Sequence, residues 1–153
     1  MQQQAGLLAT EMATQCVGVR VSRLHRLIAR RFEQALRPVG LSLPQLEVLA
    51  SLTAIGSAVA PRVLADALGV ERSTMSRNLA TLERDRLVTT VEQSPTGRSM
   101  KVAITDQGRR ALGAAEASWR TVHDELREAL GGDVASVVDA WLEQLEDARS
   151  SSP

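Results

Sequence analysis

The sequence has 153 residues, equal numbers of basic and acidic side chains, and 44% hydrophobic residues, which fits one domain with an apolar core. No apolar run is long enough to span a membrane, and the first residues lack the basic segment of a signal peptide. We therefore expect a cytoplasmic protein with no membrane partner. The one cysteine, Cys16, excludes an internal disulfide and is compatible with a reducing compartment.

The charges are segregated along the chain although the formal net charge is zero. Six arginines and one acid lie in residues 20–37, and seven basic and five acidic residues lie in residues 62–101. In residues 106–149 the balance reverses, with ten acids and five bases. Zero net charge at first argues against a nucleic-acid partner. This segregation nevertheless allows a molecule with one basic side that binds a nucleic acid.

A long helix is expected over residues 11–36, after a flexible end formed by residues 1–10. Apolar residues recur in this helix at steps of three and four, which is the period of one buried face. These residues are Val17, Val21, Leu24, Ile28, Phe32 and Ala35. A second helix is expected to begin at Ser42, because Ser42 and Gln45 match a capping box that satisfies free amides at a helix start.

Residues 61–85 predict a helix-turn-helix. Residues 61–68 form a short helix, Gly69 can take the positive φ that the turn needs, and the small Ala65 lets the two helices cross closely. The second helix, over about residues 72–85, buries a stripe made of Met75, Leu79 and Leu82. Its opposite face carries small, polar and basic side chains, which can reach phosphate oxygens and base edges in a major groove. The candidate DNA-binding residues there are Arg72, Ser73, Thr74, Ser76, Arg77 and Asn78.

A β-hairpin is predicted directly after this recognition helix. Residues 87–92 are strand-like, residues 94–97 are turn residues, and residues 100–105 alternate between apolar and other side chains. Arg98 lies at the predicted tip, where it can reach a neighbouring minor groove. This order of elements is typical of a winged helix-turn-helix that binds double-stranded DNA.

Two further helices are expected after the hairpin, with Thr105 and Asp133 as their N-caps. In the first, over residues 106–130, apolar residues are spaced by three and four in turn, as in a seam that needs a partner helix. They are Leu112, Ala115, Trp119, Val122, Leu126 and Ala129. The last helix also has one apolar face.

We therefore predict a mainly α fold with a small β-hairpin wing. Residues 42–105 would form the winged helix-turn-helix DNA-binding domain, residues 11–36 and 106–149 the dimerisation helices, and residues 1–10 and 150–153 flexible ends. A twofold homodimer would cover the terminal apolar faces and present two recognition helices to a pseudo-palindromic site. A helical bundle within one chain is the alternative.

The sequence resembles the MarR family of bacterial transcription regulators over nearly its whole length. The residues that carry the resemblance are LSLPQLEVLASL at 41–52, VLADALGVERSTMSRNLATLERDRLV at 63–88, the wing tip with Arg98, and ITDQGRRAL at 104–112. The resemblance implies a homodimeric winged-helix regulator, most often a repressor, that a small aromatic or phenolic effector releases from DNA.

The resemblance also assigns DNA contacts. The matching positions are Ser73, Thr74, Ser76 and Arg77 in the recognition helix and Arg98 in the wing. The family's wing usually reads Asp-x-Arg-Arg, whereas the tip here is Ser-Pro-Thr-Gly-Arg-Ser at 94–99. Because the family's acid holds its arginine in place, this departure puts the wing's share of the affinity in doubt.

One branch of the family is controlled by cysteine oxidation, and Cys16 lies roughly where that branch keeps its reactive thiol. Arg20, one turn later, would favour a thiolate. However, that branch surrounds the thiol with tyrosines, and this chain has no tyrosine. We favour a structural or incidental thiol and keep a redox-responsive regulator as an alternative.

Enzymes and metal sensors find no support in the sequence. His25 and His123 have no Cys or acid at a metal-ligand spacing, and no catalytic triad or phosphate loop stands out. We therefore predict no cofactor, no metal and no catalysis. A winged-helix module that binds proteins instead of DNA is the other alternative, which zero net charge and the altered wing permit.

Overall fold

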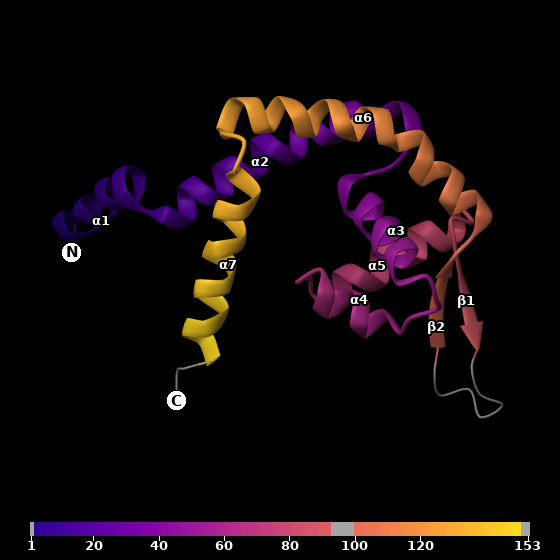
Figure 1. Ribbon diagram of the computed structural model, residues 1–153. Coiled ribbons are helices and arrows are strands. Elements are labelled where there is room, and N and C mark those ends of the chain that lie inside the picture. The colour runs from indigo at the N-terminus through magenta and orange to yellow at the C-terminus, as the bar shows by residue number, and fades with distance from the viewer. Residues whose placement is uncertain (1, 93–99, 151–153) are drawn as a thin grey trace.

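The computed structural model describes residues 2–92 and 100–150 and is mainly helical, with one two-stranded sheet (Figure 1). The elements are α1 Gln2–Gln15, α2 Val17–Leu36, the short 3-10 helix Arg37–Val39, α3 Leu43–Ile55, α4 Pro61–Ala67, α5 Arg72–Arg84, β1 Val88–Glu92, β2 Met100–Ile104, α6 Asp106–Leu130 and α7 Val134–Ser150. The predicted fold class, mainly α with a hairpin after a helix-turn-helix, is confirmed.

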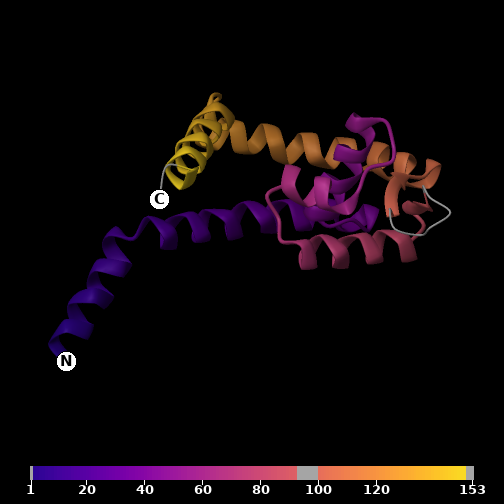
Figure 2. The same cartoon turned by 90° about the horizontal axis from the view of Figure 1, so that it is seen from below.

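A lobe made of α3, α4, α5 and the two strands lies at one end of the molecule (Figure 1). Helices α2 and α6 pack against each other, and both also contact α3 of the lobe. At the other end, α1 extends away from the lobe, and α7 turns off the far end of α6 (Figures 1 and 2). The long helices thus connect the lobe to a region built from the two ends of the chain.

The N-terminal region differs from its prediction. Two helices, α1 and α2, occupy residues 2–36, where the sequence predicts a flexible end and then one helix over 11–36. Cys16 separates them with an extended backbone, at φ −66° and ψ 114°. The prediction is wrong for residues 2–10 because it relied on apolar periodicity, whereas the Ala, Leu and Gln residues there favour a helix by intrinsic propensity.

The core lies where the end of α2, the helix-turn-helix, the hairpin and α6 meet around α3. Its most deeply buried large side chains are Leu36, Val48, Leu49, Leu52, Leu64, Met75 and Leu82. Full burial of one such side chain contributes about 1.5–3 kcal/mol. The recognition helix α5 is therefore held in a fixed orientation by the same cluster that anchors the long helices.

Two predicted helix caps are confirmed. Ser42 N donates to Gln45 Oε1 at 2.9 Å, and Gln45 N donates to Ser42 Oγ at 3.4 Å, which completes the capping box of α3. At the start of α6, Gly108 N donates to Thr105 Oγ1 at 3.0 Å. Both caps fix points at which the chain passes between the lobe and the long helices.

Apolar side chains remain exposed on the helices that extend beyond the lobe. Leu7 of α1, Val17 of α2 and Leu145 of α7 are 68%, 71% and 70% exposed, so the described chain leaves these faces largely uncovered. No single described helix is long and apolar enough to cross a membrane, although one bent pair, residues 17–39 with 43–55, passes by length and composition.

Candidate nucleic-acid interface

Helices α4 and α5 form the helix-turn-helix that the sequence predicts. Gly69 has a φ of 62°, and Val70 N donates to Ala65 O at 3.0 Å, which closes the turn. Leu64 and Ala65 are 0% and 2% exposed, so the two helices meet through an apolar and a small side chain. A residue with a Cβ would pay about 1–2 kcal/mol for the left-handed conformation of Gly69.

Helix α5 turns its apolar stripe toward the core and its polar face outward. The predicted stripe of Met75, Leu79 and Leu82 is buried. Of the predicted DNA-binding residues on this helix, Asn78 is half-buried, and those that are exposed are Arg72, Ser73, Thr74, Ser76 and Arg77. Figure 2 shows α5 along one edge of the lobe. The exposed donors thus lie together on an outer face.

Two arginines on the outer side of α5 differ in their contacts. Arg77 Nε donates to Ser73 O at 3.2 Å, one turn earlier, and this bond uses only one of its five donors. Arg84 donates to both carboxylate oxygens of Asp85, at 3.0 and 3.3 Å. The hydrogen bond and charge of Asp85 raise the pKa of Arg84 above its ordinary value. Arg77 is therefore freer than Arg84 to meet an external acceptor.

Side-chain hydrogen bonds tie the end of α5 to the wing and to α6. Glu83 Oε1 accepts from Thr90 Oγ1 at 2.8 Å and from Thr90 N at 3.3 Å. Gln107 Nε2 donates to Asp85 O at 3.2 Å. Neither contact has a local signal in the sequence, because the partners of each lie in different parts of the chain. The recognition helix is thereby coupled to β1 and to α6.

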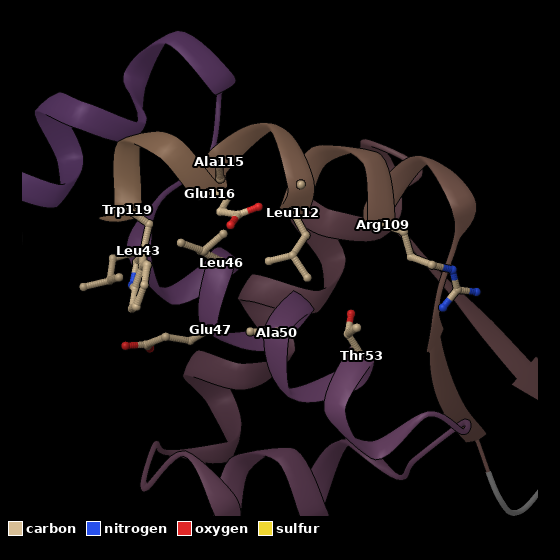
Figure 3. A pocket seen from close by; sticks show the side chains of 11 residues that line it. Leu43, Leu46, Glu47, Ala50, Thr53, Arg109, Leu112, Ala115, Glu116 and Trp119 are labelled. Atoms are coloured by element: carbon tan, nitrogen blue, oxygen red, sulfur yellow. The ribbon is translucent and has the colours of Figure 1, made fainter. Parts of the chain in front are cut away.

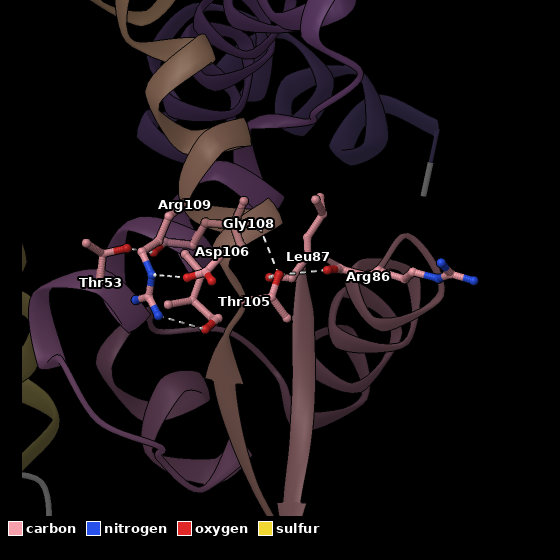
Figure 4. Close-up of polar contacts among 9 residues, drawn as sticks. Thr53, Arg86, Leu87, Thr105, Asp106, Gly108 and Arg109 are labelled. Atoms are coloured by element: carbon pink, nitrogen blue, oxygen red, sulfur yellow. Dashed lines mark hydrogen bonds and ion pairs between the residues drawn. The ribbon is translucent and has the colours of Figure 1, made fainter.

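The start of α6 is packed tightly onto the turn between α5 and β1 (Figure 4). Thr105 Oγ1 donates to Arg86 O at 2.7 Å while it accepts from Gly108 N. Arg86 itself has a positive φ of 59°. A Cβ on Gly108 would lie 2.1 Å from Leu87 O, so only glycine permits this approach.

The wing is an antiparallel pair in which Val88 pairs with Ile104 and Thr90 with Val102. Val59 adds a bridge that the sequence did not predict, because its N–H and carbonyl exchange hydrogen bonds with Val102 at 3.0 and 2.9 Å. Arg98, the predicted tip residue, lies outside the described residues. Its contact with a minor groove stays a prediction.

An apolar cavity of about 540 Å³ lies between α3 of the lobe and α6 (Figure 3). Its lining residues are Leu43, Leu46, Glu47, Ala50, Thr53, Arg109, Leu112, Gly113, Ala115, Glu116 and Trp119. Glu47 and Trp119 lie at one end of the cavity and Arg109 at the other (Figure 3). A molecule bound here would touch both the lobe and the long helix.

Two lining residues at one end of the cavity were not predicted. Desolvation by burial raises the pKa of Glu47 above its ordinary value, and the charge of His25 acts in the opposite sense. Trp119, which the sequence places in the apolar seam of α6, lines the cavity and stacks on His123 with ring centroids 4.6 Å apart. Glu47 and Trp119 lie far apart in the sequence, so only the tertiary fold brings them together.

Cys16 is partly exposed in the break between α1 and α2. The Arg20 guanidinium donates to the backbone carbonyls of Thr14 and Cys16, so this side chain is bonded to the backbone at the break between α1 and α2.

Among the residues that the structure describes, no three His, Cys, Asp or Glu side chains gather into a group that could hold a metal ion.

Comparisons with known proteins agree on one family. A sequence profile of the MarR family matches residues 39–99. The transcriptional regulator MosR of M. tuberculosis, solved in complex with DNA, is 31% identical, with 88% of this chain and 99% of that chain covered and a TM-score of 0.76. The transcriptional repressor CouR, bound to a 23-mer DNA duplex, is 28% identical, with 88% and 95% covered and a TM-score of 0.75.

A mutant of E. coli MarR with operator DNA shares the fold at 20% identity and a TM-score of 0.75, with 88% of this chain and 96% of that chain covered. A search of curated protein sequences finds no match. The helix-turn-helix, its outward polar face and the wing define a winged helix-turn-helix DNA-binding protein. The chain belongs to the MarR family of transcription regulators, a family of DNA-binding proteins without enzymatic activity.

Proposed function

We propose that this protein is a homodimeric repressor that binds a pseudo-palindromic operator and leaves it when a small effector binds. The exposed donor face of α5, fixed on a rigid lobe, carries the proposal. In this arrangement α5 enters the major groove, where Arg77 and its polar neighbours contact bases and phosphates. Arg98 supplies the contact to the minor groove.

The uncovered apolar faces support the homodimer. A groove of about 600 Å³ runs between α2 and α7, and Val17, Leu24, Trp141 and Leu145 are among the residues that line it. A second copy that packs on these helices removes this apolar surface from water, which favours association. A twofold dimer then presents its two α5 helices to half-sites roughly 34 Å apart.

The cavity between α3 and α6 supports control by an effector. A ligand that fits one spacing of lobe and long helix better than another shifts the population toward that spacing. The distance between the two α5 helices then changes, and the operator is released. A small aromatic molecule suits the apolar lining; a solved structure with this fold, the organohalide-sensing regulator RdhR, contains 2,4-dichlorophenol.

Fluorescence anisotropy with the DNA upstream of its own coding region tests the proposal, at two salt concentrations and against a scrambled competitor. Selective binding that weakens steeply as salt rises is expected, because phosphate contacts release counterions. Sedimentation of the complex should give two chains per duplex. If genome-wide selection of bound fragments also yields no selective site, the protein-interaction alternative replaces this proposal.

A further inference from the structure

The cavity between α3 and α6 has different chemistry at its two ends. Apolar side chains such as Leu46 and Leu112 form its middle. Glu47 and Trp119 lie at one end, at the N-terminal part of α3, and Arg109 lies at the other, at the start of α6 (Figure 3). The different charges at the two ends would therefore orient a ligand that carries one charged group.

Two of the three charged lining residues are already paired within the protein. Arg109 Nε lies 3.5 Å from Asp106 Oδ1, and its Nη2 donates to Ile104 O at 3.4 Å (Figure 4). Glu116 Oε1 accepts from Arg120 Nη2 at 2.6 Å. The charges of Arg109 and Glu116 are thus partly satisfied before any ligand arrives.

Glu47 differs from both. Within residues 2–92 and 100–150, no ion pair joins it to a Lys or Arg, and His25 is the basic group that acts on its charge. Desolvation raises its pKa, which means that the ionised carboxylate is under-stabilised where it lies. The Glu47 side chain remains exposed, and a cation placed beside it would favour the ionised carboxylate.

Trp119 adds a second attraction for positive charge at the same end. Its ring stacks on His123 at an interplanar angle of 13°, and the residue also lines the cavity next to Glu47. His123 covers one face of the indole, so the other face is the one that can attract a cation through the quadrupole of the ring. A carboxylate or phenolate at this end would instead meet the Glu47 carboxylate.

We propose that the cavity binds a lipophilic amine, with its apolar body between α3 and α6 and its ammonium group between Glu47 and Trp119. This inference rests on the proposed function, since it names the chemical class of the effector for the same site. It also departs from the phenolic effector that the family resemblance implies.

Isothermal titration calorimetry of the full chain, without DNA and near neutral pH, tests the charge preference. The probes are 4-phenylbutylamine and 4-phenylbutyrate, which share an apolar body and carry opposite charges. The amine should bind about tenfold more tightly, as one additional cation–carboxylate and cation–π contact would give. Equal or tighter binding of the carboxylate, or binding of neither probe, would overturn the proposal.

Glu47→Gln keeps the shape of the side chain and removes its charge. It should weaken amine binding about tenfold and leave carboxylate binding unchanged or slightly stronger. Trp119→Leu should weaken amine binding more than carboxylate binding. Glu143→Gln, on exposed α7, is the matched control and should change neither affinity.

Glu47→Gln could instead weaken the binding of both probes equally, with an unchanged circular dichroism spectrum. The residue would then shape the cavity without selecting the charge of the ligand. This result would also overturn the proposal. Operator binding is measured separately by anisotropy with free protein. Failure there would contradict the repressor function, while the titrations would still decide which charge the cavity selects.

Discussion

Arg77 lies on the outer face of α5, with its Nε bonded to Ser73 O at 3.2 Å. This bond uses one of the five donors of the guanidinium, so the others can pair with a base or a phosphate. Arg77→Ala should weaken operator binding by about 1–3 kcal/mol if it reads a base, and should weaken binding to all sequences evenly if it contacts phosphate alone. Anisotropy with operator and scrambled duplexes distinguishes the two cases.

Arg120→Ala is the control for Arg77→Ala, because Arg120 lies on the exposed face of α6 in a surface ion pair with Glu116. Such pairs contribute little to stability, so the control should fold and bind DNA as the wild type does. If Arg77→Ala binds every duplex as tightly as the wild type, α5 does not contact DNA through this residue.

Glu47 gives a prediction about pH. Partial burial raises its pKa above the ordinary value of 4.5 although the residue keeps contact with solvent, so folding mildly disfavours the ionised carboxylate. At a pH below the pKa of Glu47 in the unfolded chain, the resulting loss of stability is absent. At a pH above the raised pKa of Glu47 in the folded protein, it is fully present. Glu47→Gln removes this penalty, so its melting temperature should exceed that of the wild type near neutral pH, and the difference should shrink as the pH falls to about 4.5.

Thermal unfolding followed by circular dichroism between about pH 4 and pH 8 measures this difference. Glu128→Gln, on an exposed part of α6, serves as the control. A difference that stays constant over the whole range would contradict the assignment to Glu47.

At the scale of elements, the close approach of α6 to the α5–β1 turn depends on Gly108. A Cβ there would lie 2.1 Å from Leu87 O and 2.8 Å from Ile104 Cγ1, and the first of these is a backbone atom that does not move away easily. Gly108→Ala should therefore destabilise the fold by about 1–3 kcal/mol, the usual cost of overpacking.

Gly113→Ala is the matched control, because it lies on the same helix and a Cβ there meets nothing within 4 Å. Alanine is the better helix former, so this variant should be about 0.5–1 kcal/mol more stable than the wild type. Chemical denaturation of both variants gives the comparison. Equal stability of the two would mean that α6 does not approach the turn closely.

The elements that the sequence predicted well are those with local signals. The capping box of Ser42 and Gln45, the cap at Thr105 and the turn at Gly69 each depend on residues within one helical turn. Apolar spacing likewise predicted the buried stripe of α5. Such features are readable because the chemistry that specifies them lies in neighbouring residues.

The features that the sequence did not predict depend on distant partners or on weak local preferences. Val59 bridges to Val102, and Glu47 meets Trp119 only because α3 packs on α6. The break at Cys16 has neither proline nor glycine at the point where the backbone becomes extended. The predicted DNA-binding residues of α5 share one exposed helix face, apart from the half-buried Asn78, since a single helix sets their spacing.

In the whole molecule, the basic and acidic segments of the sequence are distributed over the lobe and the long helices. The arginine-rich residues 20–37 lie mostly on α2, which packs against the acidic α6, with Arg31 paired to Glu125. Residues 62–101 carry a smaller excess of basic side chains and span most of α4, α5 and β1, whereas residues 106–149 carry an excess of acids and span α6 and most of α7. A chain with zero net charge can thus offer DNA a basic lobe and keep its acids on other helices.

The exposed apolar face of α7 is expected to lie in the dimer interface. Leu145 is 70% exposed and lines the groove against α2, so a charge there would be buried in a dimer but solvated in a monomer. Burying a leucine contributes about 1.5–3 kcal/mol, and Leu145→Arg would replace that gain with a desolvation cost at two symmetry-related positions. Sedimentation velocity should therefore show dissociation at concentrations at which the wild type is dimeric, together with weaker operator binding.

Glu143→Arg introduces the same side chain two positions earlier, on another face of α7. It should remain dimeric, so that a general effect of positive charge on α7 is separated from an effect at the apolar face. A monomeric wild type, or a Leu145→Arg variant that stays dimeric, would place the dimer interface elsewhere. In the latter case, α1 with its exposed Leu7 and Leu8 would be the next surface to substitute.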